Sequence, residues 1–303
     1  MKALMLIVLV ACAPNTFAAE SEHTKFAATG DGARIAYYPL GIAKTVPLIV
    51  VAGGPGADAR YMRVRGALDD LARSRSVVLY DQRGTRASTD SNGSETVDQF
   101  VADLEAVRKA LDAPTVDLLG HSFGGYFAIA YTARHPANVR SLIFLDSTGA
   151  RIGDVKQLLA DTYPDRIDAW RAARAKLGRN STTADIPIFL RMEFVDEAVF
   201  QDYREAVRGH RVNQEVNDAL RKDVAERDYS EQVRGFKQPA LVLHGRHDAI
   251  IAPSTAWALH QMLPSSTFHV FEAAGHSPHI EQPAAFVAVV LPFLQRLDRD
   301  SRR

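Results

Sequence analysis

The strongest constraint on the fold of this chain lies in residues 116–134. An apolar stretch with the composition of a buried strand leads into the turn Gly-His-Ser-Phe-Gly at 120–124, and an alanine-rich helical stretch follows. Gly120 and Gly124 allow strand and helix to meet closely, since neither carries a side chain. Such a turn raises Ser122 to a helix N-terminus, where free N–H groups and the helix dipole favour negative charge. The segment therefore predicts a nucleophilic serine and acyl-transfer or hydrolytic chemistry.

An acid and a histidine follow this serine in the order that such a turn requires. Asp248 comes after the apolar segment 241–245, and His276 comes after the segment 268–271. The carboxyl ends of parallel strands meet at one edge of a sheet, so both side chains are expected beside Ser122. His276 would take the hydroxyl proton and return it to the leaving group. Asp248 would orient the imidazole and stabilise the imidazolium.

Other residues of suitable chemistry lie close to these positions. Asp146 ends another apolar segment and is the alternative acid, and His279 is the alternative base. His244, His247 and Asp248 include metal-ligand types, but alternation along a strand sends neighbouring side chains to opposite faces. We therefore predict no metal site and no cofactor.

Alternation of apolar and helical segments predicts an α/β fold with a mostly parallel, doubly wound sheet. A hairpin is expected at 25–38, since Gly30-Asp31-Gly32 separates two β-type stretches. The other expected strands lie at 47–52, 76–81, 116–119, 141–146, 240–245 and 268–271, and helices are expected at 60–71, 95–111, 124–135, 253–263 and 284–297.

The alternation stops between residues 147 and 238. This stretch is rich in Arg, Asp, Glu and Ala, and aromatic residues are spaced through helical runs. Because strands and helices resume directly afterwards, we interpret 147–238 as a helical cap inserted over the strand ends. The hydrolytic core would then comprise residues 24–146 and 239–303.

The N-terminus has the pattern of an export signal. An apolar run follows Met1-Lys2, and small residues at 16 and 18 mark a cleavage site before Ala19. Residues 1–18 are thus a predicted signal peptide, and the protein is expected to be periplasmic or secreted. Alternatively, Leu9-Val10-Ala11-Cys12 resembles a lipobox, which would make 1–11 a lipoprotein signal and anchor the chain to a membrane through a lipidated Cys12.

The charge balance bears on the class of partner. The 303 residues include 36 Lys and Arg and 36 Asp and Glu, so the formal net charge is zero. A nucleic-acid partner is therefore not expected, because phosphates require a basic face. The expected substrate is a small molecule or a short peptide.

Two further motifs follow the first core strands. Gly53-Gly54-Pro55-Gly56 can close against a reacting carbonyl, and the N–H groups of Gly54 and Phe123 are predicted to form an oxyanion hole. Loss of one such donor costs about 3–4 kcal/mol of transition-state stabilisation. The second motif begins at Asp81, and its Arg83 is expected to pair with an acid and brace the oxyanion loop. Pro55, Asp81 and Arg83 are thus assigned structural roles.

With these motifs, and with Gly275-His276-Ser277-Pro278 and Glu281, the chain resembles the α/β-hydrolase superfamily over nearly all of its mature length. Within it, the two motifs are similar to those of the proline iminopeptidase group of serine peptidases. The resemblance implies an aminopeptidase that releases N-terminal residues such as proline through an acyl-enzyme. Carboxylesterases, lactonases and C–C bond hydrolases share this scaffold and remain alternatives. A ligand-binding protein without catalysis is disfavoured by the complete set of Ser122, Asp248 and His276.

The same group holds the substrate α-amino group with carboxylates of the cap. The resemblance therefore makes Glu193, Glu197 and Glu226 candidate substrate-binding residues. The sequence also departs from the group: Ala52 replaces a usual His, Arg86 a usual Gly, and Phe123 a common Trp. These departures leave the catalytic set intact and bear on peptide specificity.

Overall fold

The computed structural model describes residues 24–89, 92, 95–177, 186–210 and 212–301. The predicted signal peptide 1–18, and Cys12 with it, lie outside the described residues. Within the described ranges, no helix has both the length and the apolar character to cross a bilayer.

The strands of the core form where the apolar segments predicted them. They are β1 (Lys25–Ala28), β2 (Arg34–Leu40), β3 (Leu48–Val51), β4 (Val77–Tyr80), β5 (Val116–His121), β6 (Val139–Leu145), β7 (Ala240–Gly245) and β8 (Ser266–Phe271). The longer helices are α1 (Ala67–Ala72), α2 (Val97–Ala110), α3 (Gly124–Arg134), α5 (Pro164–Leu177), α7 (Glu197–Ala206), α8 (Gln214–Val224), α9 (Ser230–Gly235), α10 (Pro253–Met262) and α12 (Pro283–Asp300). Shorter ones are α4 (Leu159–Thr162), α6 (Ile186–Leu190) and α11 (Pro278–Glu281), with 3-10 turns η2 (Ala59–Gly66), η3 (Pro136–Asn138), η4 (Ile152–Asp154) and η6 (Arg191–Glu193).

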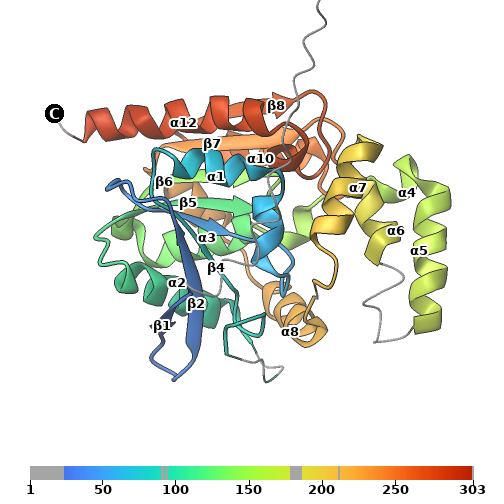
Figure 1. Cartoon of the computed structure of the whole chain (residues 1–303), viewed down its shortest axis with the longest axis horizontal. Coiled ribbons are helices and arrows are strands. Elements are labelled where there is room, and N and C mark those ends of the chain that lie inside the picture. Colours follow the sequence, from blue (N-terminus) through green and yellow to red (C-terminus); the bar gives the residue numbers. More distant parts are fainter. Residues whose placement is uncertain (1–23, 90–91, 93–94, 178–185, 211, 302–303) are drawn as a thin grey trace, which may run out of the picture.

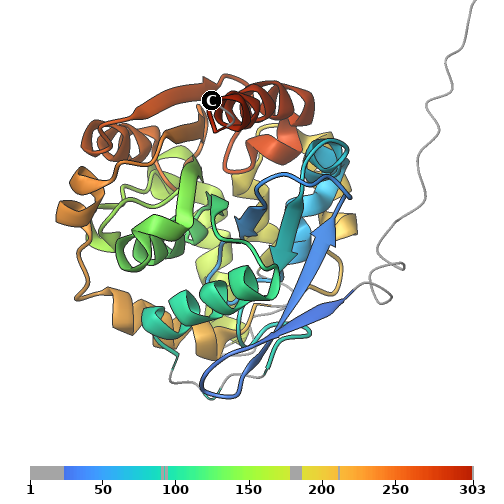
Figure 2. The ribbon, with the colours of Figure 1, turned by 90° about the vertical axis from the view of Figure 1, so that its left-hand side faces the viewer.

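The described strands form one 8-stranded sheet in the order β1-β2-β4-β3-β5-β6-β7-β8. The strands from β4 to β8 pair in parallel, whereas β1 and β2 are antiparallel to their neighbours. Helices cover both sides of the twisted sheet (Figure 2). The predicted mostly parallel α/β fold is confirmed.

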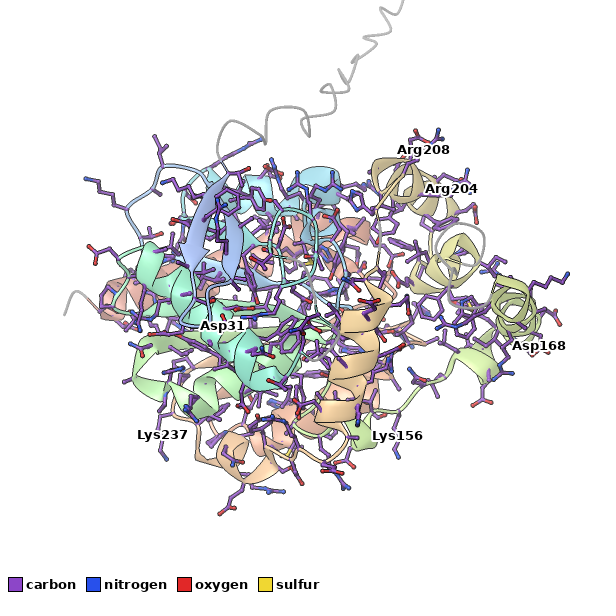
Figure 3. The ribbon with its side chains drawn as sticks, turned by 90° about the horizontal axis from the view of Figure 1, so that it is seen from below. Asp31, Lys156, Asp168, Arg204, Arg208 and Lys237 are labelled. Atoms are coloured by element: carbon purple, nitrogen blue, oxygen red, sulfur yellow. The ribbon has the colours of Figure 1, made fainter. Side chains whose placement is uncertain are left out.

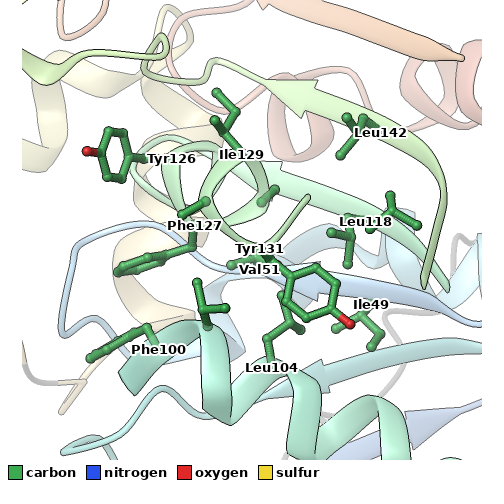
Figure 4. Packing of buried hydrophobic residues seen from close by; sticks show 14 of the residues in the cluster. Ile49, Val51, Phe100, Leu104, Leu118, Tyr126, Phe127, Ile129, Tyr131 and Leu142 are labelled. Carbon is green, nitrogen blue, oxygen red and sulfur yellow. The ribbon is translucent and has the colours of Figure 1, made fainter. Parts of the chain in front are cut away.

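Burial on both faces explains why the core strands are apolar without alternation. In β3, Ile49 and Val51 pack in the cluster that contains α2 and α3, which Figure 4 shows from close by. Leu48 and Val50 point the other way, into the cluster with α1 and α12. All four side chains are fully buried. The central strands, whose ends carry the candidate site, are therefore fixed from both sides.

The predicted cap divides into two parts. Helices α4 to α7 stand beside the strand ends, at the right of Figure 1, and Asp168 and Arg204 project outward from α5 and α7 in Figure 3. By contrast, α8 and α9 pack on the core, because Val216, Leu220 and Val233 belong to the same buried cluster as α2 and α3. The cap over the strand ends is thus narrower than the predicted range 147–238.

The predicted helix at 60–71 is interrupted. Residues 59–66 form η2, and α1 begins only at Ala67. Arg65 and Gly66 adopt positive φ angles of 61° and 78°, a left-handed conformation that an α-helix does not continue through. The break places η2 directly after the oxyanion loop.

Candidate active site

Ser122 occupies the sharp turn between β5 and α3, with a positive φ of 54°. The glycines on either side are required by close contacts of the backbone. A Cβ atom at Gly120 would lie 2.6 Å from the Cα of Gly125, and one at Gly124 would lie 2.1 Å from the carbonyl oxygen of Val51. The strand therefore passes directly into the helix, with the serine side chain at the turn.

The structure brings Ser122, His276 and Asp248 into one hydrogen-bonded chain. His276 Nε2 lies 2.9 Å from Ser122 Oγ, and His276 Nδ1 lies 2.7 Å from Asp248 Oδ2. The other oxygen of Asp248 accepts hydrogen bonds from the backbone N–H groups of Ile250 and Ile251, at 2.8 and 3.0 Å. Asp248 follows β7 and His276 follows β8, so the strand ends bring together the three side chains as expected.

Electrostatics stabilise the charged form of the His276–Asp248 pair. Burial alone would lower the pKa of His276, but the charge and hydrogen bond of Asp248, helped by Glu193, raise it to about 9. Burial acts to raise the pKa of Asp248, and the opposing charge of His276 outweighs it, so that this pKa is lowered. The resting imidazole must therefore lose a proton before it can act as a base.

Asp146, the alternative acid, lies immediately beside this pair. Its side chain is fully buried at the end of β6, and its Oδ1 accepts a hydrogen bond of 2.8 Å from the N–H of Gly245. Burial, reinforced by the neighbouring charge of Asp248, raises the pKa of Asp146 well above its ordinary range. Asp248 holds the direct bond to His276, and Asp146 is favoured as a neutral acid behind it.

Possible metal ligands lie in the same region. Side-chain ligand atoms of Asp146, Asp248 and His276 all lie within 4.8 Å of one another. Asp248 and His276 are hydrogen-bonded to each other, and this bond accounts for their proximity without an ion. In the alternative set, His244 Nε2 lies 3.4 Å from Asp248 Oδ2 and donates to the carbonyl of Ile251, whereas His247 is exposed, so the three residues do not come together as one set of ligands.

The predicted oxyanion loop, residues 53–56, lies against Ser122. A Cβ atom at Gly53 would lie only 2.8 Å from the Cβ of Ser122. Any side chain at position 53 would therefore displace the loop or Ser122. Gly54 has a φ of 119°, and its peptide bond to Pro55 is cis. Phe123 stands at the N-terminus of α3, next to the serine. The N–H groups of Gly54 and Phe123 thus remain the candidate donors to an oxyanion.

Gln82 braces this loop, whereas the sequence had led us to predict this role for Arg83. The amide nitrogen of Gln82 donates to the carbonyl of Ala52 at 2.8 Å, and its amide oxygen accepts from the N–H of Gly56 at 3.0 Å. A buried amide can hold both sides of a loop because it has a donor and an acceptor. The sequence signal that could have indicated this role is the position of Gln82 within the motif Asp81-Gln82-Arg83-Gly84.

Arg83 and Asp81 have structural roles away from the loop. Arg83 pairs with Asp103 of α2 and with Asp31 of the β1–β2 turn, at 2.6 and 2.7 Å. Asp81 accepts hydrogen bonds from the hydroxyl of Tyr38 at 2.6 Å. The predicted pairing of Arg83 with an acid is present, but it ties the hairpin to α2, so the prediction that it braces the oxyanion loop was wrong.

Of the three cap carboxylates, only Glu193 borders the catalytic set. Its backbone carbonyl accepts the N–H of His276 at 2.7 Å, and burial raises the pKa of its carboxyl to about 7. Glu197 is exposed and bonds with Arg191 and Gln201, each at 2.5 Å. Glu226 is exposed beyond the end of α8. The structure therefore does not support Glu197 and Glu226 as substrate-binding residues, because both point into solvent.

Glu281 connects the histidine loop to the cap. One carboxylate oxygen accepts the N–H of Gly275 at 2.5 Å, and the other accepts the N–H of Val195 at 2.6 Å. The residue was recognised in the sequence only as part of a motif. Its position fixes the loop of His276 relative to the segment that carries Glu193.

The alternative base, His279, does not contact the serine. It is fully buried, and burial lowers its pKa to about 3, with a further contribution from His276. Its ring packs against those of His121 and Tyr61, at centroid distances of 5.2 and 6.4 Å. It is thus a neutral packing residue behind the site.

Comparison with known proteins gives the family. The protein-family model with the description "alpha/beta hydrolase fold" matches residues 46–283 of this chain. The chain belongs to the α/β-hydrolase family. The proline iminopeptidase of Heyndrickxia coagulans is 30% identical over 270 residues, covering 83% of this chain and 91% of that protein. The 2-hydroxy-6-oxo-2,4-heptadienoate hydrolase of Pseudomonas putida is 28% identical over 264 residues, covering 83% and 90%.

A solved structure supports the same fold for this α/β hydrolase. The thermophilic esterase of Thermogutta terrifontis superposes with a TM-score of 0.72 at 24% identity, covering 91% of this chain and 99% of that one. The relatives carry different activities at nearly equal similarity. These similarities establish that the chain is a hydrolase of this family. They do not identify its substrate.

The two buried acids give a direct test of their roles. Asp248→Asn should lower kcat for p-nitrophenyl acetate by about 10⁴-fold, because the amide leaves His276 in the wrong tautomer. Asp146→Asn should lower kcat less than about 10-fold, because an amide replaces a neutral acid of the same shape. Steady-state kinetics of both variants check this, and a larger loss for Asp146→Asn would reverse the assignment.

Proposed function

We propose that this α/β hydrolase is a serine hydrolase that acts through an acyl-enzyme, and that it is an aminopeptidase releasing N-terminal residues such as proline. The hydrogen-bonded chain from Ser122 through His276 to Asp248 carries the first part of the proposal. The partly buried carboxyl of Glu193, which interacts electrostatically with His276, supports the second part.

The proposed reaction has two similar halves. Ser122 Oγ attacks the substrate carbonyl while its proton moves to His276 Nε2, and the N–H groups of Gly54 and Phe123 stabilise the resulting oxyanion. The intermediate collapses, the bond to the amine breaks, and the amine leaves with the proton from His276. Water then attacks the acyl-enzyme with the same residues, which releases the acid and restores Ser122.

The position of Glu193 suits a positively charged amine. Burial raises the pKa of its carboxyl to about 7, whereas the pKa of an α-amino group is about 7.7–8.0. A carboxylate–ammonium pair is therefore available between these values. The bound ammonium would also offset the negative charge that helps to raise the pKa of His276, which favours the neutral base when substrate is present.

Hydrolysis of an ester or of a C–C bond is the second candidate. The similarity to the P. putida dienoate hydrolase, nearly equal to that with the iminopeptidase, supports it. The replacements Ala52 and Phe123 in the iminopeptidase motifs favour it as well. Both candidate functions use Ser122 as the nucleophile, so assays with different substrates are needed to distinguish them.

Glu193→Gln tests the aminopeptidase proposal, with Glu197→Gln as the matched control. We expect Glu193→Gln to lower kcat/KM for proline p-nitroanilide by roughly 10- to 100-fold, because a charged hydrogen bond is worth about 1.5–3 kcal/mol. Its activity on p-nitrophenyl acetate at the high-pH plateau, where His276 is already neutral, should change little. Glu197→Gln should behave as wild type on both. Wild-type turnover of the ester without any turnover of proline p-nitroanilide would overturn the peptidase assignment and favour the second candidate.

The pH profile tests the electrostatics of the base. Attack requires neutral His276, whose pKa is raised to about 9, so kcat/KM for p-nitrophenyl acetate should rise with pH and level off only above about 9. Glu193→Gln removes a negative charge that raises this pKa, so the rising limb should move to lower pH. A rising limb with its midpoint near pH 6.5 in the wild type, or a shift of this limb to higher pH in Glu193→Gln, would contradict the raised pKa of His276.

A further inference from the structure

A line of buried hydrogen bonds runs behind the nucleophile. The N–H of Gly53 lies 2.7 Å from the hydroxyl oxygen of Tyr61, and that oxygen lies 2.6 Å from His121 Nδ1. His121 Nε2 lies 2.8 Å from the backbone carbonyl oxygen of His276. Tyr61 is 8% exposed and His121 3% exposed, so water does not compete for these groups.

The chemistry of the two ends, together with a neutral His121, fixes the direction of every bond. A backbone N–H only donates, so the Tyr61 oxygen accepts from Gly53 and its own proton goes to His121 Nδ1. A carbonyl only accepts, so His121 Nε2 carries the proton that bonds to His276. The line is complete only with a neutral His121 protonated at Nε2. Burial, together with the charge of His276, lowers the pKa of His121 well below its ordinary value and maintains this form.

The line connects the three loops that the proposed reaction needs. Gly53 precedes the oxyanion donor Gly54, His121 precedes the nucleophile Ser122, and the accepting carbonyl belongs to His276 itself. The bond to Tyr61 also occupies the N–H of Gly53 and leaves that of Gly54 for the substrate. The side chain of Tyr61 comes from η2, the turn that directly follows the oxyanion loop.

We propose that Tyr61 and His121 are positioning residues that hold the oxyanion loop and the histidine loop at a fixed separation on either side of Ser122. The inference rests on the proposed serine-hydrolase function. Neither side chain reacts with the substrate. Their effect is on transition-state binding, because oxyanion donors act only when they are held at the position where negative charge develops.

Tyr61→Phe removes the central hydroxyl and keeps the shape of the ring. We expect kcat for p-nitrophenyl acetate to fall by about 10- to 100-fold with KM changed less than about threefold. The inhibition constant of phenylboronic acid, which forms a charged tetrahedral adduct with a serine, should rise by a similar factor. Tyr80→Phe is the matched control: it is 1% exposed, and its hydroxyl has no hydrogen-bond partner among the described atoms. Its kcat and boronate affinity should equal those of wild type.

Replacement of His121 gives an independent test with a conservative rescue. His121→Leu removes both bonds and should lower kcat at least as much as Tyr61→Phe. His121→Gln places an amide nitrogen near the position of Nε2, which restores the donor to His276, and should recover part of the lost kcat. A merely structural role would instead change kcat in parallel with thermal unfolding and leave the boronate affinity of the folded fraction unchanged.

The outcomes separate this inference from the proposed function. If Tyr61→Phe is folded and keeps wild-type kcat and boronate affinity while Ser122→Ala is inactive, the positioning role is refuted and the serine mechanism stands. If Ser122→Ala retains full activity, the serine mechanism fails, and the positioning role fails with it.

Discussion

Four hydrogen bonds to His276 are the interactions on which the rest of the site depends. Its Nδ1 bonds to Asp248, its Nε2 to Ser122, its backbone N–H to Glu193, and its backbone carbonyl to His121. These partners come from β5, from the loop after β7 and from the cap. One residue on a loop is thereby held to four points of the chain, each by a bond of 2.7 to 2.9 Å. These bonds explain how a loop can hold the imidazole at the fixed position that the proposed reaction requires.

The arrangement works only because the sheet beneath it is fixed from both sides. Residues of β3, β5 and β6 are buried on both faces, so the ends of these strands have little freedom to shift. The cap is tied to the same edge through Glu281 and through the backbone of Glu193. In the proposed function, substrate recognition by the cap and acid–base chemistry by the core would therefore be coupled through these hydrogen bonds.

The sequence was sufficient for the parts of the site that depend on local pattern and chain order. The turn around Ser122, and the acid and histidine after later strands, were predictable because strand ends meet at one edge. Gln82 and Tyr61 were not, since their roles depend on where their side chains point after folding. The choice of Glu193 over Glu197 has the same origin: they lie four positions apart, yet the carboxyl of Glu193 interacts electrostatically with His276 and that of Glu197 is exposed to solvent. Likewise, residues 214–224 were assigned to the cap, because the sequence does not show that this helix packs on the core.

Labelling with diisopropyl fluorophosphate, followed by peptide mapping, tests most directly whether these segments form one reactive centre. The account predicts a single adduct, on Ser122, that forms faster as the pH rises and does not form in His276→Ala. No adduct on the folded protein, an adduct on another residue, or equal labelling of His276→Ala would contradict it.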